Sequence, residues 1–184
     1  MKWMRLRIIL PVLLFGQLIM FSQNENLTEK EVEQIKKEII QRAEKQATDL
    51  QNLDYEQIMT FYADVDDFIV YGDGYYWGDY ITIDRLWKSF TKNVKENTWT
   101  FSNPKIHVFN KDVASLLVEF DHHRTHPNGA KRGGHGCFSF GLQKIESDWK
   151  VVTMHVTHNY DVFDENGEIR KWWINLMPEN REKN

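Results

Sequence analysis

Residues 149–160 read WKVVTMHVTHNY, and the predicted sheet is built around this segment. It is rich in β-branched residues and contains neither Gly nor Pro, which is typical of a β-strand. Strand alternation divides its side chains between two faces, Val151, Thr153, His155 and Thr157 on one and Val152, Met154, Val156 and His158 on the other. Because both faces carry apolar groups, we predict a central strand, with an imidazole among small hydroxyls on its first face.

Three more strands are predicted before it, over residues 98–109, 112–126 and 133–146. The breaks between them are short and hold turn-forming residues, at 110–111, 127–129 and 147–148. Such connections predict a mostly antiparallel meander. A shorter strand is expected at residues 68–71, ended by a turn at 72–74.

Helices are predicted mainly in the first half of the chain. Residues 28–50 repeat apolar side chains at three- and four-residue steps, and Thr28 with Glu31 forms a capping box. A short helix should follow Asp54, and a third should run over 82–95, capped by Asp79 or Thr82. Helices followed by strands predict an α+β fold.

The two ends of the chain differ from this domain. Residues 1–22 join Lys2, Arg5 and Arg7 to an apolar run, as in a secretory signal peptide, so we expect a secreted or periplasmic protein; an uncleaved anchor is the alternative. Losing three positive charges would take the net charge from −4 to −7, which argues against nucleic-acid binding and, after cleavage, against membrane binding. The extension 161–184 holds Trp172 and Trp173, which are expected to cover the domain or a partner chain.

Several motifs together resemble the nuclear transport factor 2-like fold and, within it, the SnoaL-like proteins. They are the helix junction at Asp54, the segment FYADVDDFIVYGDG at 61–74, Gly78 and WKVVTMHVTH at 149–158. The resemblance covers residues 29–160. It implies three helices against a strongly curved sheet, which together form a cone with an internal pocket. The family includes isomerases, dehydratases, cyclases, hydrolases and assembly domains, so the resemblance does not fix a function.

The predicted hairpins allow a first layout of the sheet. They place Ser139 opposite His155 and Gly141 opposite Thr153, and they place Phe120 near Ser139 and His122 near Cys137. One mixed face then becomes the candidate pocket, closed by aromatic side chains from the helices. The predicted ligand-binding residues are His122, His135, Ser139, Thr153, His155, Tyr62 and Trp87.

His155 is the predicted general acid or base, because an imidazole can adopt both protonation states near neutral pH. The alternative is a buried structural histidine whose ring nitrogen forms a hydrogen bond with Ser139 or Tyr62. A partner carboxylate would be needed, with Asp73 and Glu119 among the candidates.

We expect no metal and no cofactor. In the segment DHHRTH at 121–126, His122 and His126 share a strand face but lie ~13 Å apart, too far for one ion. A site would need histidines from neighbouring strands. Cys137, the only cysteine, is expected to be a small packed residue.

The sequence thus predicts a homodimeric protein that binds a small, partly apolar molecule in the cone. An isomerase, dehydratase or cyclase that uses His155 is one alternative, and a non-catalytic assembly domain is the other. A hollow beside His155 favours the first two readings, and a filled interior favours the third.

Overall fold

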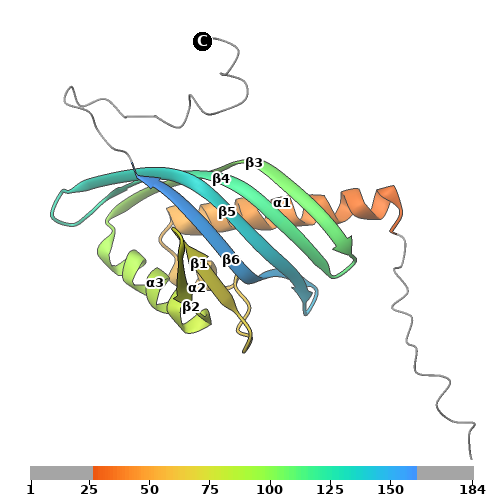
Figure 1. The fold of residues 1–184 in the computed structure, drawn as a ribbon. Helices are drawn as coiled ribbons and strands as arrows, with labels where there is room; N and C mark the ends of the chain where they lie inside the picture. The colour runs from red at the N-terminus through yellow and green to blue at the C-terminus, as the bar shows by residue number, and fades with distance from the viewer. Residues whose placement is uncertain (1–26, 161–184) are drawn as a thin grey trace, which may run out of the picture.

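The computed structural model describes residues 27–160, so the predicted signal peptide and the extension 161–184 lie outside the described residues. Four long strands arch over the helices (Figure 1). The elements in chain order are α1 (Glu29–Gln51), α2 (Tyr55–Met59), β1 (Ile69–Gly72), β2 (Tyr75–Gly78), α3 (Tyr80–Asn93), β3 (Glu96–Asn110), β4 (Val113–Thr125), β5 (Lys131–Ile145) and β6 (Asp148–Tyr160).

The helices begin where the sequence predicts. Thr28 and Glu31 make the capping box of α1, the Asp54 side chain accepts from the Gln57 N–H at the start of α2, and Asp79 caps α3. The buried residues of α1 include Ile35, Ile39, Ala43, Ala47 and Leu50, and the helix packs mainly against β3. Within residues 27–160, none of the helices has both the length and the apolar character that a membrane crossing needs.

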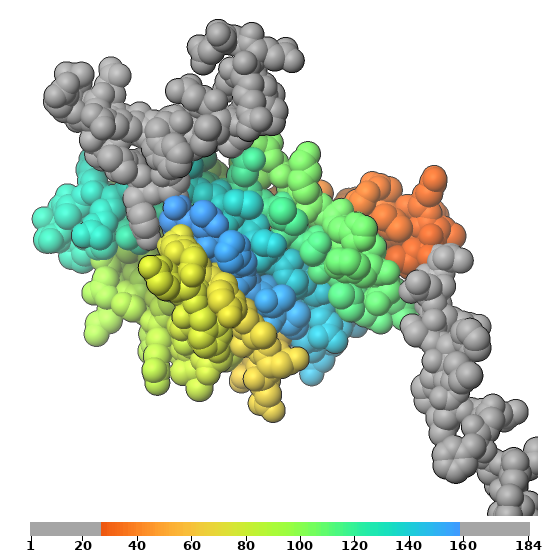
Figure 2. All heavy atoms as spheres, viewed as in Figure 1, coloured from red at the N-terminus to blue at the C-terminus, as the bar shows by residue number. Residues whose placement is uncertain are grey.

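The sheet has six strands in the order β2-β1-β6-β5-β4-β3. All neighbouring pairs are antiparallel except β1 and β6, which run parallel, so β6 is a central strand as predicted. Figure 2 shows the yellow and gold surface of β1 and β2 directly against the blue surface of β6.

The strand β2 is absent from the sequence prediction. It forms a two-residue hairpin with β1, in which Gly72 pairs with Tyr75. Asp73 and Gly74 both have positive φ, of 50° and 87°, which a tight hairpin turn requires and an Asp-Gly pair favours. The Asp73-Gly74 pair is a hairpin signal in the sequence, but the sequence prediction uses it only as the end of a strand.

One predicted register is confirmed and the next is wrong. Ser139 pairs with His155 and Gly141 with Thr153, as predicted. Phe120, however, pairs with Gly136 rather than Ser139, a shift of three residues. The cause is the β4–β5 loop, which is centred on Asn128: the N–H of His126 donates to the Ala130 carbonyl oxygen at 2.8 Å. An odd shift moves every side chain of one strand to the other face relative to its neighbour.

The concave face of the sheet is therefore the apolar one. Its buried side chains are Leu116, Val118 and Phe120 on β4, Phe138, Phe140 and Leu142 on β5, and Met154 and Val156 on β6. A bulge beside Gly141 also brings Val151 to this face, where it is fully buried. The other β5 and β6 residues of the predicted mixed face lie on the outer face of the sheet, whereas His122 on β4 lies on the concave face.

Candidate functional site

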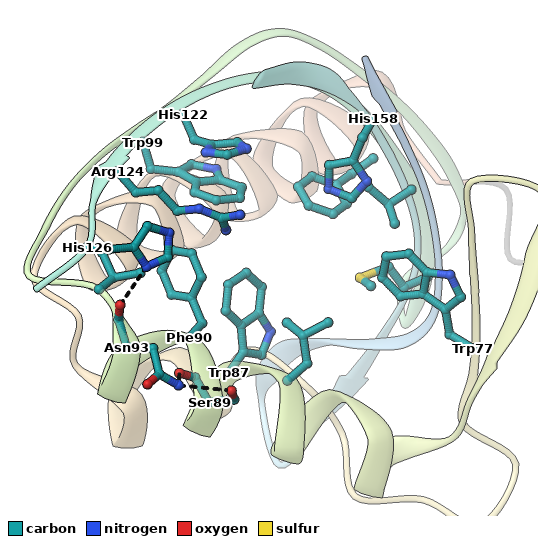
Figure 3. A pocket seen from close by; sticks show the side chains of 15 residues that line it. Trp77, Trp87, Ser89, Phe90, Asn93, Trp99, His122, Arg124, His126 and His158 are labelled. Atoms are coloured by element: carbon teal, nitrogen blue, oxygen red, sulfur yellow. Dashed lines mark hydrogen bonds between the residues drawn. The ribbon is translucent and has the colours of Figure 1, made fainter. Parts of the chain in front are cut away.

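A cavity of about 360 Å³ lies between α3 and the concave face, at the end of the sheet where β4 stops and β6 ends (Figure 3). This volume suits a small molecule. Its walls combine large aromatic rings with a few polar side chains. The lining residues are Trp77, Leu86, Trp87, Ser89, Phe90, Asn93, Val94, Trp99, His122, Arg124, His126, Phe138, Met154, Val156 and His158.

The polar groups arise where the apolar rows of the concave face end. On β4 the row of Leu116, Val118 and Phe120 continues as His122 and Arg124, and on β6 Val156 is followed by His158. The same strand alternation that builds the core thus delivers imidazoles and a guanidinium to the cavity. Figure 3 shows His158 and Trp77 on one side, and His122, Arg124 and His126 on the other.

His158 and Asp73 form a histidine–carboxylate pair. The Nδ1 atom of His158 lies 3.0 Å from Oδ2 and 3.2 Å from Oδ1 of Asp73, and the backbone N–H of His158 donates to Oδ1 at 2.7 Å. The N–H of Asp73 in turn donates to the Val156 carbonyl oxygen at 3.0 Å. The β1–β2 turn is thereby held against β6. A carboxylate that contacts Nδ1 favours the tautomer in which Nδ1 carries the hydrogen and Nε2 can accept a proton.

Two aromatic rings hold the His158 imidazole. Trp77 stacks on it with ring centres 6.1 Å apart, and Phe120 meets it edge-on at 5.4 Å. Phe120 can lie there because its ring packs over Gly136, which has no side chain. A Cβ atom at this position would overlap the Phe120 ring and the Thr157 carbonyl oxygen. A positioned imidazole with an orienting carboxylate can serve as a general acid or base.

His122 is the most buried imidazole of the site, with 3% of its surface exposed. It stacks on Trp99 at 4.9 Å, and its Nδ1 has no hydrogen-bond partner among the described residues. Burial first, and then the positive charge of Arg124, lower the pKa of His122 to about 4. His122 is therefore neutral at physiological pH.

His126 and Arg124 complete the β4 side. The Nδ1 of His126 lies 2.8 Å from the Asn93 carbonyl oxygen at the end of α3, so Nδ1 carries the proton. The Arg124 guanidinium carbon lies 5.6 Å from the ring centre of Phe90.

Only two of the predicted ligand-binding residues, His122 and Trp87, line the cavity. Tyr62 is buried in the core beside Trp87, where burial raises its pKa. The other four lie on the outer face of the sheet, namely His135, Ser139, Thr153 and His155.

The predicted inward position of His155 is wrong, because its side chain is exposed on the outer face. Cys137 lies on that face too, half-buried, and burial raises the pKa of its thiol. Within residues 27–160, no group of three or more His, Cys, Asp or Glu side chains is placed to hold a metal ion.

The predicted ligand-binding residues omit His158, Arg124 and His126, although the sequence layout places Arg124 on the mixed candidate face. A signal for the last two existed, since His122, Arg124 and His126 are spaced by two and must share one strand face. Asp73 was among the predicted partner carboxylates, and the structure pairs it with His158 instead of His155.

Solved structures with the same fold are numerous. They include a provisionally assigned scytalone dehydratase from Novosphingobium aromaticivorans, with TM-score 0.64, 11% identity and coverage of 72% of this chain and 89% of that one. A nuclear transport factor 2-like superfamily protein from Salmonella enterica serovar Typhimurium has TM-score 0.60, 17% identity and coverage of 76% and 99%. A type 2 hexachlorocyclohexane dehydrochlorinase, LinA, has TM-score 0.60, 10% identity and coverage of 72% and 90%. At these identities the similarity shows a shared fold.

A search of curated proteins finds no match to the chain. The model of the SnoaL-like domain family, in contrast, matches residues 39–158, which is more than half of the chain. The match spans α1 to β6 and so includes every element that lines the cavity. The chain therefore belongs to the SnoaL-like domain family.

Proposed function

We propose that this protein binds a small, flat, partly apolar molecule in the cavity between α3 and the concave face. The observation that carries the proposal is a hollow of about 360 Å³ with the indoles of Trp77, Trp87 and Trp99 in its walls. Aromatic walls favour a flat ligand, and the few polar groups among them can orient it. A hollow interior also favours binding over the assembly-domain alternative.

Tryptophan fluorescence provides the test, because three indoles line the cavity. We expect 2-naphthamide, a flat neutral probe, to change the fluorescence of the wild-type protein saturably. Val156→Phe adds a ring inside the cavity and should weaken this binding at least about tenfold, which corresponds to ~1.4 kcal/mol.

Thr157→Phe is the matched control, because it adds the same ring to the exposed outer face one residue away. It should bind the probe as the wild type does, as should His155→Gln. If Val156→Phe keeps wild-type affinity while circular dichroism shows it folded, the ligand does not enter this cavity.

A second candidate function is acid–base catalysis by His158, supported by its contact with Asp73. In such a reaction the Nε2 of His158 takes a proton from a carbon beside a carbonyl group, and the electron pair of the broken C–H bond passes into an enolate. Asp73 stabilises the imidazolium that forms, and the proton later returns. Two of the structures that share this fold are described as a dehydratase and a dehydrochlorinase.

Exchange of carbon-bound hydrogen tests this candidate without knowledge of the natural substrate. In D₂O, the wild-type protein should catalyse deuterium uptake beside the carbonyl of 2-tetralone, followed by mass spectrometry. His158→Gln should lower the catalysed exchange about 100-fold or more, the range for loss of a positioned proton carrier, and Asp73→Asn, which removes only the orienting carboxylate, should slow it by less. His155→Gln is the control and should exchange normally. Catalysed exchange that persists in His158→Gln would exclude this role.

Two further expectations remain proposals. Residues 1–22 support export, giving a secreted or periplasmic protein. A homodimer through the outer face of the sheet is supported by exposed apolar side chains there, such as Leu117 at 44% exposure.

A further inference from the structure

One nitrogen atom on the β4 side of the cavity is a hydrogen-bond acceptor, and a contact with the backbone fixes this role. The Nδ1 atom of His126 lies 2.8 Å from the carbonyl oxygen of Asn93, the last residue of α3. A carbonyl oxygen only accepts, so Nδ1 carries the hydrogen of the neutral ring. The other ring nitrogen, Nε2, then has a lone pair and accepts a hydrogen bond. Figure 3 draws the bond between His126 and Asn93.

This acceptor has no donor in the part of the chain that the structure describes. The Nε2 atom of His126 is buried and makes no hydrogen bond there. A buried polar atom without a partner is costly, so such atoms in native proteins are usually met by another group. His126 and Asn93 both line the cavity, and a bound molecule can therefore supply the missing donor.

Two other groups of the cavity wall lack partners in the same way. The Nε1 atom of Trp99 and the Nδ1 atom of His122 are buried without hydrogen bonds within residues 27–160, and each residue is 3% exposed. An indole N–H only donates, so it requires an acceptor. His122 is neutral at physiological pH and brings no charge that an anion would balance. The wall thus contains both a donor and an acceptor, and a neutral hydroxyl group matches either one.

We infer that His126 determines the specificity of the cavity by selecting a ligand with a hydroxyl group on its flat body, whose O–H donates to Nε2. The ligand class is therefore a phenol, which is neutral at pH 7. An ether or a halide in place of the hydroxyl group has no hydrogen to donate and leaves Nε2 unpaired. This inference rests on the proposed function, since it names the chemical class of the molecule bound in the same cavity.

A matched pair of probes tests the inference. 2-Naphthol and 2-fluoronaphthalene have the same ring system and nearly the same size, but only 2-naphthol has a hydrogen to donate. In equilibrium dialysis the wild-type protein should bind 2-naphthol at least about fivefold more tightly, the effect of one neutral hydrogen bond to a buried acceptor. His126→Phe keeps a ring without an acceptor, and it should lose this preference and still bind 2-fluoronaphthalene. His126→Gln has a carbonyl oxygen that accepts, and it should retain part of the preference.

His123→Phe is the matched control, because it makes the same replacement on β4 at an exposed position outside the cavity. It should prefer 2-naphthol as the wild type does. The inference is overturned, and the proposed function stands, if wild type binds both probes equally, if it binds 2-naphthamide but neither probe, or if His126→Phe keeps the full preference. Absence of wild-type binding to both probes and to 2-naphthamide overturns both. The wild-type comparison needs no variant, so it decides the question even if His126→Phe folds poorly.

Discussion

Replacing Trp99 by alanine should lower the free energy of unfolding by about 3 to 5 kcal/mol, the range for removal of a large buried aromatic side chain. Trp99 is 3% exposed and joins β3 to the rest of the core. It stacks on His122 at 4.9 Å and Phe120 at 5.4 Å between ring centres. It meets Trp87 edge-on at 6.0 Å. Because Trp99 forms part of the cavity wall, its removal enlarges a space that the neighbouring side chains already leave empty.

Urea denaturation measures this change as a lower midpoint at constant m-value. Tyr76→Ala is the control, since Tyr76 is an aromatic residue with 61% exposure, and its loss should change stability by less than about 0.5 kcal/mol. Trp99→Phe should fall between the two. A loss below ~1 kcal/mol for Trp99→Ala would show that the ring cluster around it does not hold β3 and α3 together.

Local sequence signals determine most of the fold. Side-chain oxygens of Thr28, Asp54 and Asp79 mark three helix starts, and period-two alternation marks the four long strands. Each of these signals lies within a few residues of the element that it predicts. The short hairpin connections are equally local, so the antiparallel meander could be predicted as well.

The site depends on contacts that no local signal encodes. The parallel pairing of β1 with β6 joins segments some 85 positions apart, and it alone brings Asp73 to His158. The β4–β5 register depends on which residue lies at the centre of the connecting loop. An error of three residues in this register exchanges the two faces of β4 relative to β5.

The choice of His155 over His158 follows from a physical assumption that fails in this fold. A mixed face of small and polar residues was expected to line the hollow, and the apolar face to form a core or an interface. Here one concave face does both, because its apolar rows fill the core and then end in His122, Arg124 and His158 at the cavity. The position along the strand, as well as the face, decides whether a side chain packs or binds.

Acidification from pH 7 to pH 5 should cost the folded protein about 2 kcal/mol through His122 alone. The pKa of His122 is lowered to about 4 in the folded protein by burial, then by the charges of Arg124, His158 and His123. The unfolded chain has the ordinary histidine pKa of ~6.5. Between these two values the unfolded chain binds a proton that the folded protein does not, so stability falls as the pH falls.

His122→Phe should remove this part of the pH dependence, because it replaces the imidazole by a ring that can stack on Trp99 and carries no titrating group. His123→Gln is the matched control: it deletes the adjacent imidazole of β4, which is exposed on the opposite face. Because the charge of His123 contributes least to the lowered pKa of His122, this variant should change the slope only slightly. Urea denaturation at pH 7, 6 and 5 measures all three proteins, and carboxylates, with ordinary pKa values near 4, add little over this interval. Equal slopes for wild type and His122→Phe would mean that His122 can take up a proton in the folded state at little cost. The imidazole would then have to be in contact with water, and the dry aromatic wall that the ligand proposal assumes would not exist.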